Sequence, residues 1–423
     1  MRRASAFLAV LLVGLLPTPG SSTHALADEP APAPVAAPPQ AEAPESPPVV
    51  ASEAVGATRA SIERGAGWLG ENQNKNGSWG SSASNLWDIY APPPGSQQAF
   101  QTASVALALS GLLENRERLA ASAEERARID EQIERATVWL LDHHAIRRIR
   151  ADTLYNTWAL SYALEAFARL LERKPAPERR AQLREGCERC IDLLERFEFA
   201  EGGWGYYNFD AQTRRPGPGA TSFTTATALI AMHRAAQQGV SVPERLVERG
   251  KRIIRLSWRP DNAFYYSPDH RLAGARMGVN QVKGSLARTP TCLLALELWG
   301  EPVPAAKWRK CFEDLEEFGH FLRIARKYPI PHETWYQNSG YFCLYGYYYA
   351  AMSLRFLPAD VAREHADRIA FHVRGMQEKD GSTWDYQLFQ FHKAYGTGYS
   401  LLALDEALDV LERPQVVADD AAR

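Results

Sequence analysis

Helical segments of two alternating kinds fill the chain after residue 55, and they constrain its fold more than any other feature. One kind is charged on one face and apolar on the other, the pattern of a helix that covers a core. The other kind is apolar on nearly every side, so protein must surround it. We therefore predict an all-α fold with an apolar inner layer and an amphipathic outer layer. The outer segments are predicted at 57–73, 129–143, 181–197, 243–258, 305–326 and 361–377, and the inner ones at 98–113, 154–171, 222–236, 285–299, 340–356 and 395–411.

The inner segments share a short repeat of an aromatic residue, any residue, threonine, five residues and alanine. Phe100, Thr102 and Ala108 form one copy. Successive copies lie 52 to 68 residues apart, which leaves room for one helical hairpin each. Six such hairpins close naturally into a double ring, an (α/α)6 toroid; an open solenoid is the competing arrangement, although solenoid repeats are usually shorter and more regular. Further copies begin at Tyr155, Phe223 and Tyr395, and partial copies cover 288–296 and 345–352.

The first residues predict export. Arg2 and Arg3 precede an apolar run, and small residues around Ala27 suit a cleavage site. We predict a signal peptide over 1–27 and a periplasmic or extracellular protein without a membrane span, because the apolar run is too short. The proline- and alanine-rich segment 28–54 cannot bury enough apolar surface to fold and reads as a disordered tether. The toroid domain is then expected over 55–412 and a flexible tail over 413–423.

Charge and cysteine content exclude some classes of partner. The 48 basic and 50 acidic residues give a formal charge of −2, so no overall field attracts nucleic acid or an anionic membrane. We expect neither as a partner, and the oligomeric state stays open. Cys187 and Cys190 form a C-x-x-C inside a predicted helix, without a second pair. Two small residues on a packed helix face is the favoured interpretation over zinc or redox use, and whether the two thiols pair stays open.

Two outer segments end in related motifs. Residues 73–80 read Gln-Asn-Lys-Asn-Gly-Ser-Trp-Gly, residues 377–384 read Gln-Glu-Lys-Asp-Gly-Ser-Thr-Trp, and 201–205 is a partial copy. These resemble the Q-x-x-D-G-S-W repeat of the terpenoid cyclase and protein prenyltransferase superfamily, the prenyltransferase and squalene oxidase repeat of squalene-cyclase-like toroids. The glutamine amide can cap a helix end, the glycine permits the turn and the tryptophan covers the junction between hairpins. We therefore expect Trp79 and Trp384 to be buried.

The resemblance implies the fold but not the superfamily's chemistry. Squalene-hopene-type cyclases protonate their substrate with a D-x-D-D-T-A motif, and the similar stretch here, 221–226, has no acid. The zinc-binding Y-H-T-C-Y-C-L segment of prenyltransferase β subunits resembles 395–401, where Gly396 stands at the histidine position. No D-D-x-x-D segment offers a magnesium site. We expect no metal and no cofactor.

In a toroid, the amino ends of the inner helices converge on a central mouth, so polar and aromatic residues there are candidate ligand contacts. Arg288 needs an anionic or carbonyl partner if it is desolvated, either in a ligand or in a structural pair with an acid such as Asp152 or Glu333. Aromatic side chains can stack on sugars, hold apolar chains or stabilise a cation, although most simply form core. The candidate ligand-binding residues are Gln101, Asn156, Trp158, Tyr207, Thr224, Arg288, Tyr341, Tyr345 and Tyr395.

Candidate acid–base groups lie on loops that lead into inner segments. Loop carboxylates and single histidines are usually turn or capping residues, and sequence gives no distances between them. Whether the chain is an enzyme, and which residues catalyse, therefore stays unknown. The candidates are Asp210, Glu333, Asp152 and Asp385, with His332 and His392 as further titratable groups.

Three functions fit the sequence. The first is a toroid that binds a small amphipathic or isoprenoid-like molecule in a central cavity. The second is an exported carbohydrate-active enzyme, of the polysaccharide lyase or glycosidase kind, acting on an oligosaccharide. The third is a structural envelope protein. A deep apolar cavity favours the first, an open cleft with paired carboxylates the second, and a filled centre the third.

Overall fold

The computed structural model describes residues 51–83, 94–146, 155–206 and 219–413. The expected signal peptide, most of the expected tether and nearly all of the expected tail lie outside these ranges. The first helix starts at Ala51, so residues 51–54 of the expected tether belong to it. Among the described helices, none combines the length and the apolar character needed to cross a membrane.

Outer and inner helices alternate along the chain. The outer helices are α1 (Ala51–Glu71), α3 (Ala123–His143), α5 (Pro177–Phe197), α7 (Glu244–Ser257), α11 (Ala305–Phe318) continued by α12 (His320–Ala325), and α14 (Ala359–Arg374). The inner helices are α2 (Pro94–Leu119), α4 (Asn156–Glu172), α6 (Ser222–Gln237), α9 (Val282–Ser285) with α10 (Arg288–Leu298), α13 (Phe342–Ser353) and α15 (His392–Leu411). Short turns of helix lie between them: α8 (His270–Ala273), η1 (Gly278–Asn280), η2 (Trp335–Gln337) and η3 (Leu354–Phe356).

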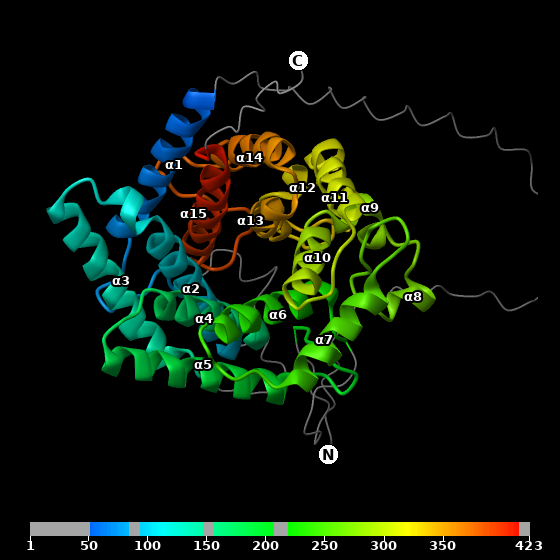
Figure 1. Cartoon of the computed structure of the whole chain (residues 1–423), viewed down its shortest axis with the longest axis horizontal. Coiled ribbons are helices and arrows are strands. Elements are labelled where there is room, and N and C mark those ends of the chain that lie inside the picture. The colour runs from blue at the N-terminus through cyan, green and yellow to red at the C-terminus, as the bar shows by residue number, and fades with distance from the viewer. Residues whose placement is uncertain (1–50, 84–93, 147–154, 207–218, 414–423) are drawn as a thin grey trace, which may run out of the picture. The chain divides into compact units, whose positions relative to one another are not determined.

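The inner helices form a closed ring. Each packs against the next along the chain, from α2 through α4, α6, α10 and α13 to α15, and α15 packs against α2. Figure 1 shows these helices around the centre, with α1, α3, α5, α7, α11 and α14 outside them. An open solenoid has no contact between its first and last repeat, so the all-α (α/α)6 toroid is confirmed.

Burial follows from this double layer. Every residue of α13, from Phe342 to Ser353, is buried, and α6 is buried from Ser222 to Met232. An outer helix such as α7 instead buries one stripe, which includes Leu246, Ile253 and Ile254. Helices that are apolar all round require this inner position because every side meets protein.

The hairpin junctions share one turn geometry. In the first copy the Gln73 side-chain amide donates to the Gly77 carbonyl at 3.0 Å, and in another the Gln377 amide donates to Gly381 at 2.9 Å. Gly77, Gly381 and Gly202 all have left-handed backbone, with φ of 90°, 89° and 105°. A Cβ on Gly77 would lie 2.2 Å from the carbonyl oxygen of Arg135, so this turn needs glycine.

The structure places Trp384 differently from the sequence prediction. Trp79 is fully buried, as expected, and its indole donates to the Leu69 carbonyl at 2.8 Å. Gln73 pairs with Trp79, but Gln377 pairs with Thr383, so Thr383 occupies the tryptophan position and Trp384 follows it, only partly buried. The better second copy is Trp204, fully buried, whose indole donates to the Leu194 carbonyl at 2.8 Å.

A further copy of this turn has no sequence signature. Trp258 pairs with Phe264, which is fully buried, and Asn262 takes the left-handed position with a φ of 72°. The Phe264 amide donates to the Ser285 hydroxyl at 2.8 Å, just as the Trp204 amide donates to Thr225 at 3.0 Å. Ser285 is therefore the counterpart of the repeat threonine. Thr289, which the sequence favours for that position, lies one helical turn later.

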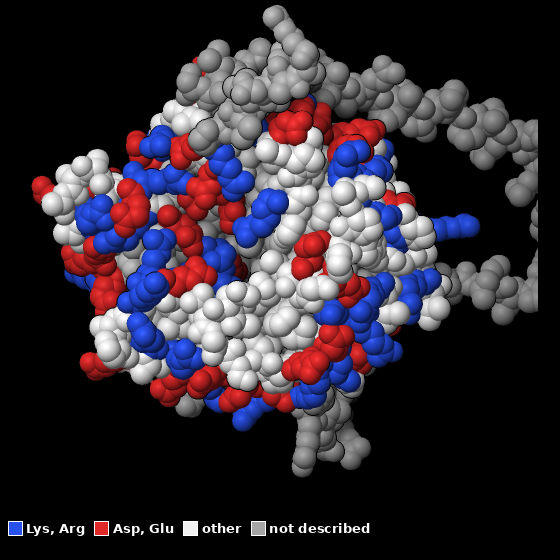
Figure 2. Space-filling view, in the orientation of Figure 1, with Lys and Arg blue, Asp and Glu red and all other residues white. Residues whose placement is uncertain are grey.

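Surface charge is mixed, in agreement with the near-zero formal charge. On the face shown in Figure 2, basic and acidic residues are interspersed rather than gathered by sign. Many are paired across helices; Arg118 of α2, for example, contacts Asp405 at 3.0 Å and Glu412 at 2.8 Å. Inside α5, Cys187 and Cys190 are buried as free thiols, which fits packing on the inner side of that helix.

Candidate functional site

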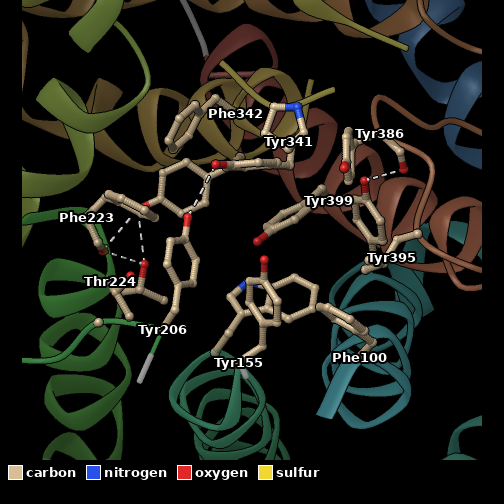
Figure 3. A pocket seen from close by; sticks show the side chains of 16 residues that line it. Phe100, Tyr155, Tyr206, Phe223, Thr224, Tyr341, Phe342, Tyr386, Tyr395 and Tyr399 are labelled. Carbon is tan, nitrogen blue, oxygen red and sulfur yellow. Dashed lines mark hydrogen bonds between the residues drawn. The ribbon is translucent and has the colours of Figure 1, made fainter. Parts of the chain in front are cut away.

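An aromatic cavity opens at the amino ends of the inner helices. Its empty space measures about 830 Å³ including the mouth. The lining is overwhelmingly apolar, and no charged side chain belongs to it among the described residues. Figure 3 shows the hydroxyls of Tyr206, Tyr341 and Tyr399 directed into or along this space. The lining residues are Phe100, Tyr155, Trp158, Gly205, Tyr206, Phe223, Thr224, Thr227, Pro331, Tyr341, Phe342, Tyr345, Tyr386, Leu388, Tyr395 and Tyr399.

Among the described residues, the walls come from the amino-terminal parts of α2, α4, α6, α13 and α15 and from the loops before them. The rings meet mostly edge to face. Trp158 lies 5.6 Å from Tyr162 and Phe223 lies 5.2 Å from Phe342, with interplanar angles of 83° in both pairs. Aromatic rings prefer this edge-to-face geometry, so these contacts stabilise the ring orientations that line the cavity.

Three phenols and a histidine form a hydrogen-bonded chain at one wall of the mouth. The Tyr266 hydroxyl donates to the Tyr206 hydroxyl at 3.0 Å, and the Tyr206 hydroxyl donates to that of Tyr341 at 3.3 Å. The Tyr341 hydroxyl lies 3.1 Å from His332 Nε2. His332 Nδ1 lies 2.7 Å from the Gln337 carbonyl, which can only accept, so Nδ1 carries the proton and Nε2 accepts from Tyr341.

The histidine of this chain favours its neutral form. Burial lowers the pKa of His332, and the nearby Arg288 and His270 lower it further, although the hydrogen bond to Gln337 acts in the other direction. The His332 backbone is left-handed, with a φ of 62°, and Tyr336 and Gln337 on the same loop have φ of 56°. Several left-handed residues without glycine indicate a loop that its surroundings hold in place.

A second group of phenols lies at the floor of the cavity. The Tyr399 hydroxyl donates to Tyr162 at 2.5 Å, and Tyr162 lies 3.2 Å from the Tyr349 hydroxyl. Next to them, the Tyr348 hydroxyl donates to Glu165 at 2.6 Å, and the Arg169 guanidinium donates to the same carboxylate at 2.8 Å. Because Glu165 and Arg169 are both buried, each neutralises the other where either alone would be costly.

The candidate acid Asp385 lies behind the wall rather than in it. Its carboxylate accepts from the Leu344 amide at 2.8 Å, at the first turn of α13, and from the Tyr395 hydroxyl at 2.7 Å. Burial raises the pKa of Asp385 to about 6, against the lowering effect of these two hydrogen bonds. Asp385 is therefore a buried carboxylate that holds a cavity tyrosine and caps an inner helix.

Arg288 also lies behind the wall, with no exposed surface. Its guanidinium donates to the backbone carbonyls of Gly284 at 3.0 Å and Phe264 at 3.2 Å, and to that of Val279. Burial lowers the pKa of Arg288 to about 10, so the group is still charged near neutral pH. The sequence left open whether Arg288 pairs with carbonyl groups or with an acid. Backbone carbonyls hold it, and Glu333 is exposed and does not pair with it. The repeat register explains why Arg288 lies away from the cavity. Ser285 is the counterpart of the repeat threonine, so Gly284, not Arg288, occupies the position before it.

The structure brings together part of the predicted site. Gln101 is partly buried and donates to the Ser78 hydroxyl at 3.3 Å, and Asn156 is buried at the start of α4; neither lines the cavity. Among the candidate acids, only Asp385 and Glu333 fall within the described ranges, because Asp152, Asp210 and the ligand candidate Tyr207 lie outside them. The predicted residues that line the cavity are Trp158, Thr224, Tyr341, Tyr345 and Tyr395.

Several lining residues outside the predicted set carry a recurring sequence signal. The aromatic position of the inner-helix repeat, occupied by Phe100, Tyr155, Phe223 and Tyr395, faces the cavity in every full copy. The repeat indicates not only the fold but also a ring of aromatic side chains around its centre. Tyr386 and Tyr399 had no comparable signal.

Comparisons with known proteins identify the fold and nothing finer. No protein-family model matches the chain, and no curated protein matches it. A solved structure of D-mannose isomerase is similar with a TM-score of 0.54 and 12% identity, covering 83% of this chain and 97% of that one. At this identity the likeness supports the α/α toroid alone.

Two other solved structures align more loosely. One is a variant of the type II terpene cyclase MstE from Scytonema in complex with geranylgeranyl dihydroxybenzoate, with a TM-score of 0.48, 13% identity, and coverage of 85% of this chain and 100% of that one. The other is a possible member of the GH105 family from Klebsiella pneumoniae, with a TM-score of 0.47, 14% identity, and coverage of 86% and 94%. Both are toroids, and the scores carry no further conclusion.

Proposed function

We propose that this chain binds a small amphipathic molecule, with an isoprenoid-like or aromatic body, in the cavity at the amino ends of its inner helices. The observation that carries the proposal is the lining: eleven aromatic side chains, one of them a tryptophan, surround a space with no charged side chain among the described residues. Such walls favour an apolar body because contact with it removes apolar surface from water. Polar ends can be met by the hydroxyls of Tyr206, Tyr341 and Tyr399.

The carbohydrate-active alternative ranks second. Aromatic rings can stack on sugars, and Trp158 and Tyr155 would be available for this. Glycoside hydrolysis, however, normally needs two carboxylates flanking the bond. Among the described residues, Asp385 is buried behind Tyr395 and Glu333 does not belong to the lining, so the part of the site that is described offers no such pair. A structural envelope protein would have a filled centre. The open aromatic cavity therefore speaks against that alternative.

Calorimetric titration of the full chain distinguishes these ligand classes. Farnesol, an amphipathic isoprenoid alcohol, is expected to bind with a dissociation constant in the micromolar range, a fair value for a ligand of its size in an apolar pocket. Mannose and cellobiose are expected to bind far more weakly because their many hydroxyls would lose water without finding enough partners. Tight binding of either sugar without farnesol binding would reverse the order of the two proposals.

Export is proposed on the residues outside the described ranges. The basic residues Arg2 and Arg3, the apolar run after them and the small residues before Asp28 support a cleaved signal peptide. An exported location would expose the cavity to small molecules of the periplasm or the medium.

A further inference from the structure

The phenol chain at the mouth ends on a group that can accept a proton. The sequence places its members far apart: Tyr206 follows α5, Tyr266 follows α7, and His332 and Tyr341 flank η2. The fold aligns their hydroxyls so that each donates to the next, and the last donates to the imidazole of His332. Two of these four hydrogen-bonded residues, Tyr206 and Tyr341, line the cavity. Tyr266 and His332 lie behind them and hydrogen-bond to them.

The hydrogen bond between Tyr341 and His332 has a fixed donor and a fixed acceptor. His332 Nδ1 is committed to the Gln337 carbonyl, so the lone pair of Nε2 points at the Tyr341 hydroxyl. The loop fixes the ring, since the His332 amide also donates to the Ser339 hydroxyl at 2.9 Å. Tyr266 packs on the imidazole at 5.4 Å with an interplanar angle of 81°. A phenol hydroxyl that already donates to a fixed imidazole can transfer its proton to that imidazole while the phenol oxygen accepts a second proton from a bound molecule.

A buried cation lies next to the same chain. The Arg288 guanidinium is 5.6 Å from the centre of the Tyr266 ring and 5.7 Å from that of Phe342. It lowers the pKa of His332 and so favours the neutral imidazole, the form that can accept a proton. It also acts to lower the pKa of Tyr266, but burial raises that pKa well above its ordinary value, so Tyr266 keeps its proton and remains a donor in the hydrogen-bonded chain.

We infer that Tyr341 and His332 form an acid–base pair that removes a proton from a carbon or oxygen acid bound in the aromatic cavity. The inference rests on the proposed function, because the acid must reach the cavity to meet Tyr341. In the step, the Tyr341 proton moves to His332 Nε2 while the Tyr341 oxygen takes the proton of the substrate. The electron pair of the broken substrate bond stays with the substrate, as an anion or as a new multiple bond that expels a leaving group. Tyr341 is the catalytic residue and His332 a positioning residue that receives the proton.

A defined probe tests the pair without knowledge of the natural substrate. 5-Nitrobenzisoxazole is a flat aromatic molecule that suits the cavity. Loss of its carbon-bound proton to a base breaks the nitrogen–oxygen bond and forms a nitrile and a coloured phenolate, so atoms and charge balance. The full chain is expected to accelerate this elimination, and Tyr341→Phe and His332→Gln are each expected to lower the rate constant by at least about tenfold. Tyr347→Phe and His372→Gln, which remove a phenol and an imidazole outside the cavity, are the matched controls and should leave it unchanged.

The pH profile separates a proton-accepting role of His332 from a structural one. The wild-type rate should stay high well below neutral pH, since burial lowers the pKa of His332. In His332→Gln the rate should rise only at alkaline pH, where a phenol, whose ordinary pKa is about 10, loses its own proton. Tyr266 packs on the imidazole, Arg288 and His270 act on its charge, and Tyr206 contacts the Tyr341 hydroxyl. All four groups are present in both proteins. A His332→Gln profile parallel to that of the wild type would overturn the inference.

Binding and turnover are measured apart. If calorimetry shows that the probe binds and the two variants match the controls in rate, the acid–base pair is refuted while the cavity proposal stands. If the probe does not bind, the cavity proposal is contradicted for aromatic ligands, and ¹⁵N resonances of histidine decide the pair on their own. One histidine should show a hydrogen-bonded, unprotonated Nε2 that changes in Tyr341→Phe, and an unchanged spectrum would refute the pair.

Discussion

The Tyr395 hydroxyl donates to the carboxylate of Asp385 at 2.7 Å, and this bond joins a wall of the cavity to the start of α13. Asp385 is fully buried, and burial raises its pKa to about 6. A carboxyl group whose folded pKa lies above the unfolded value of about 3.9 stabilises the fold less as pH rises between the two. This contribution is complete below about pH 4 and is lost by about pH 7.

Replacing Asp385 with Asn should remove that pH dependence. The difference in unfolding free energy between Asp385→Asn and the wild type should shift by about 2 to 3 kcal/mol in favour of the variant from pH 4 to pH 7. Urea unfolding at the two pH values measures it. Asp192→Asn, which replaces an exposed aspartate inside α5, is the control for the loss of a carboxylate away from a helix start. A pH-independent difference for Asp385→Asn would show that Asp385 is not desolvated as described.

The two tryptophans of the hairpin motifs should differ in their effect on stability. Trp79→Ala should cost about 3 to 5 kcal/mol, the range for a fully buried aromatic side chain. Trp384→Ala should cost about 1 kcal/mol, because Trp384 is only partly buried and its ring contacts the Lys327 ammonium at 4.3 Å and the His392 ring at 5.0 Å. Denaturant unfolding of both variants checks the difference. Equal losses would contradict the assignment of Thr383 to the tryptophan position.

Arg288 should behave as a structural residue. Arg288→Met keeps the length of the side chain but leaves three carbonyls, those of Gly284, Phe264 and Val279, without this donor, so it should destabilise the fold by about 3 kcal/mol. Arg252→Met on the exposed face of α7 is the control, with an expected change near zero. A fully stable Arg288→Met protein with weakened ligand binding would instead return Arg288 to the ligand site.

The amino terminus provides a separate prediction. If residues 1–27 are a signal peptide, the intact mass of protein recovered from the periplasm or medium of a secreting host should correspond to a chain that begins near Asp28. Retention of the first residues in that fraction would refute the export proposal. The fold and cavity would be unaffected by that result.

Sequence periodicity was sufficient for the architecture because both signals, apolar helices and a recurring aromatic-x-threonine spacing, are local. It was insufficient where register changes. The pairing of Gln377 with Thr383 moves Trp384 out of its expected position, and the use of Ser285 in place of Thr289 moves Arg288 away from the mouth. A shift of one residue or one turn leaves the apolar pattern intact, so only the backbone contacts show it.

The candidate site was predictable only in part, for a related reason. Tyr345 and Tyr395 lie on inner helices whose amino ends converge, and both line the cavity as expected. The chain from Tyr266 to His332 joins loops of different hairpins, and no spacing along the sequence encodes which hydroxyl meets which. Such tertiary hydrogen bonds are the part of a site that a single sequence does not show.

The most direct test of the central claim, that a small amphipathic ligand occupies the aromatic cavity, is calorimetric titration of farnesol into the full chain and two variants. Thr224→Trp fills the cavity from α6, whereas Glu188→Trp adds the same ring on the exposed face of α5. Circular dichroism and thermal unfolding first establish that both variants fold like the wild type. We predict micromolar binding to the wild type and Glu188→Trp and its loss in Thr224→Trp. Equal binding to all three proteins, or none to the wild type, would contradict the claim.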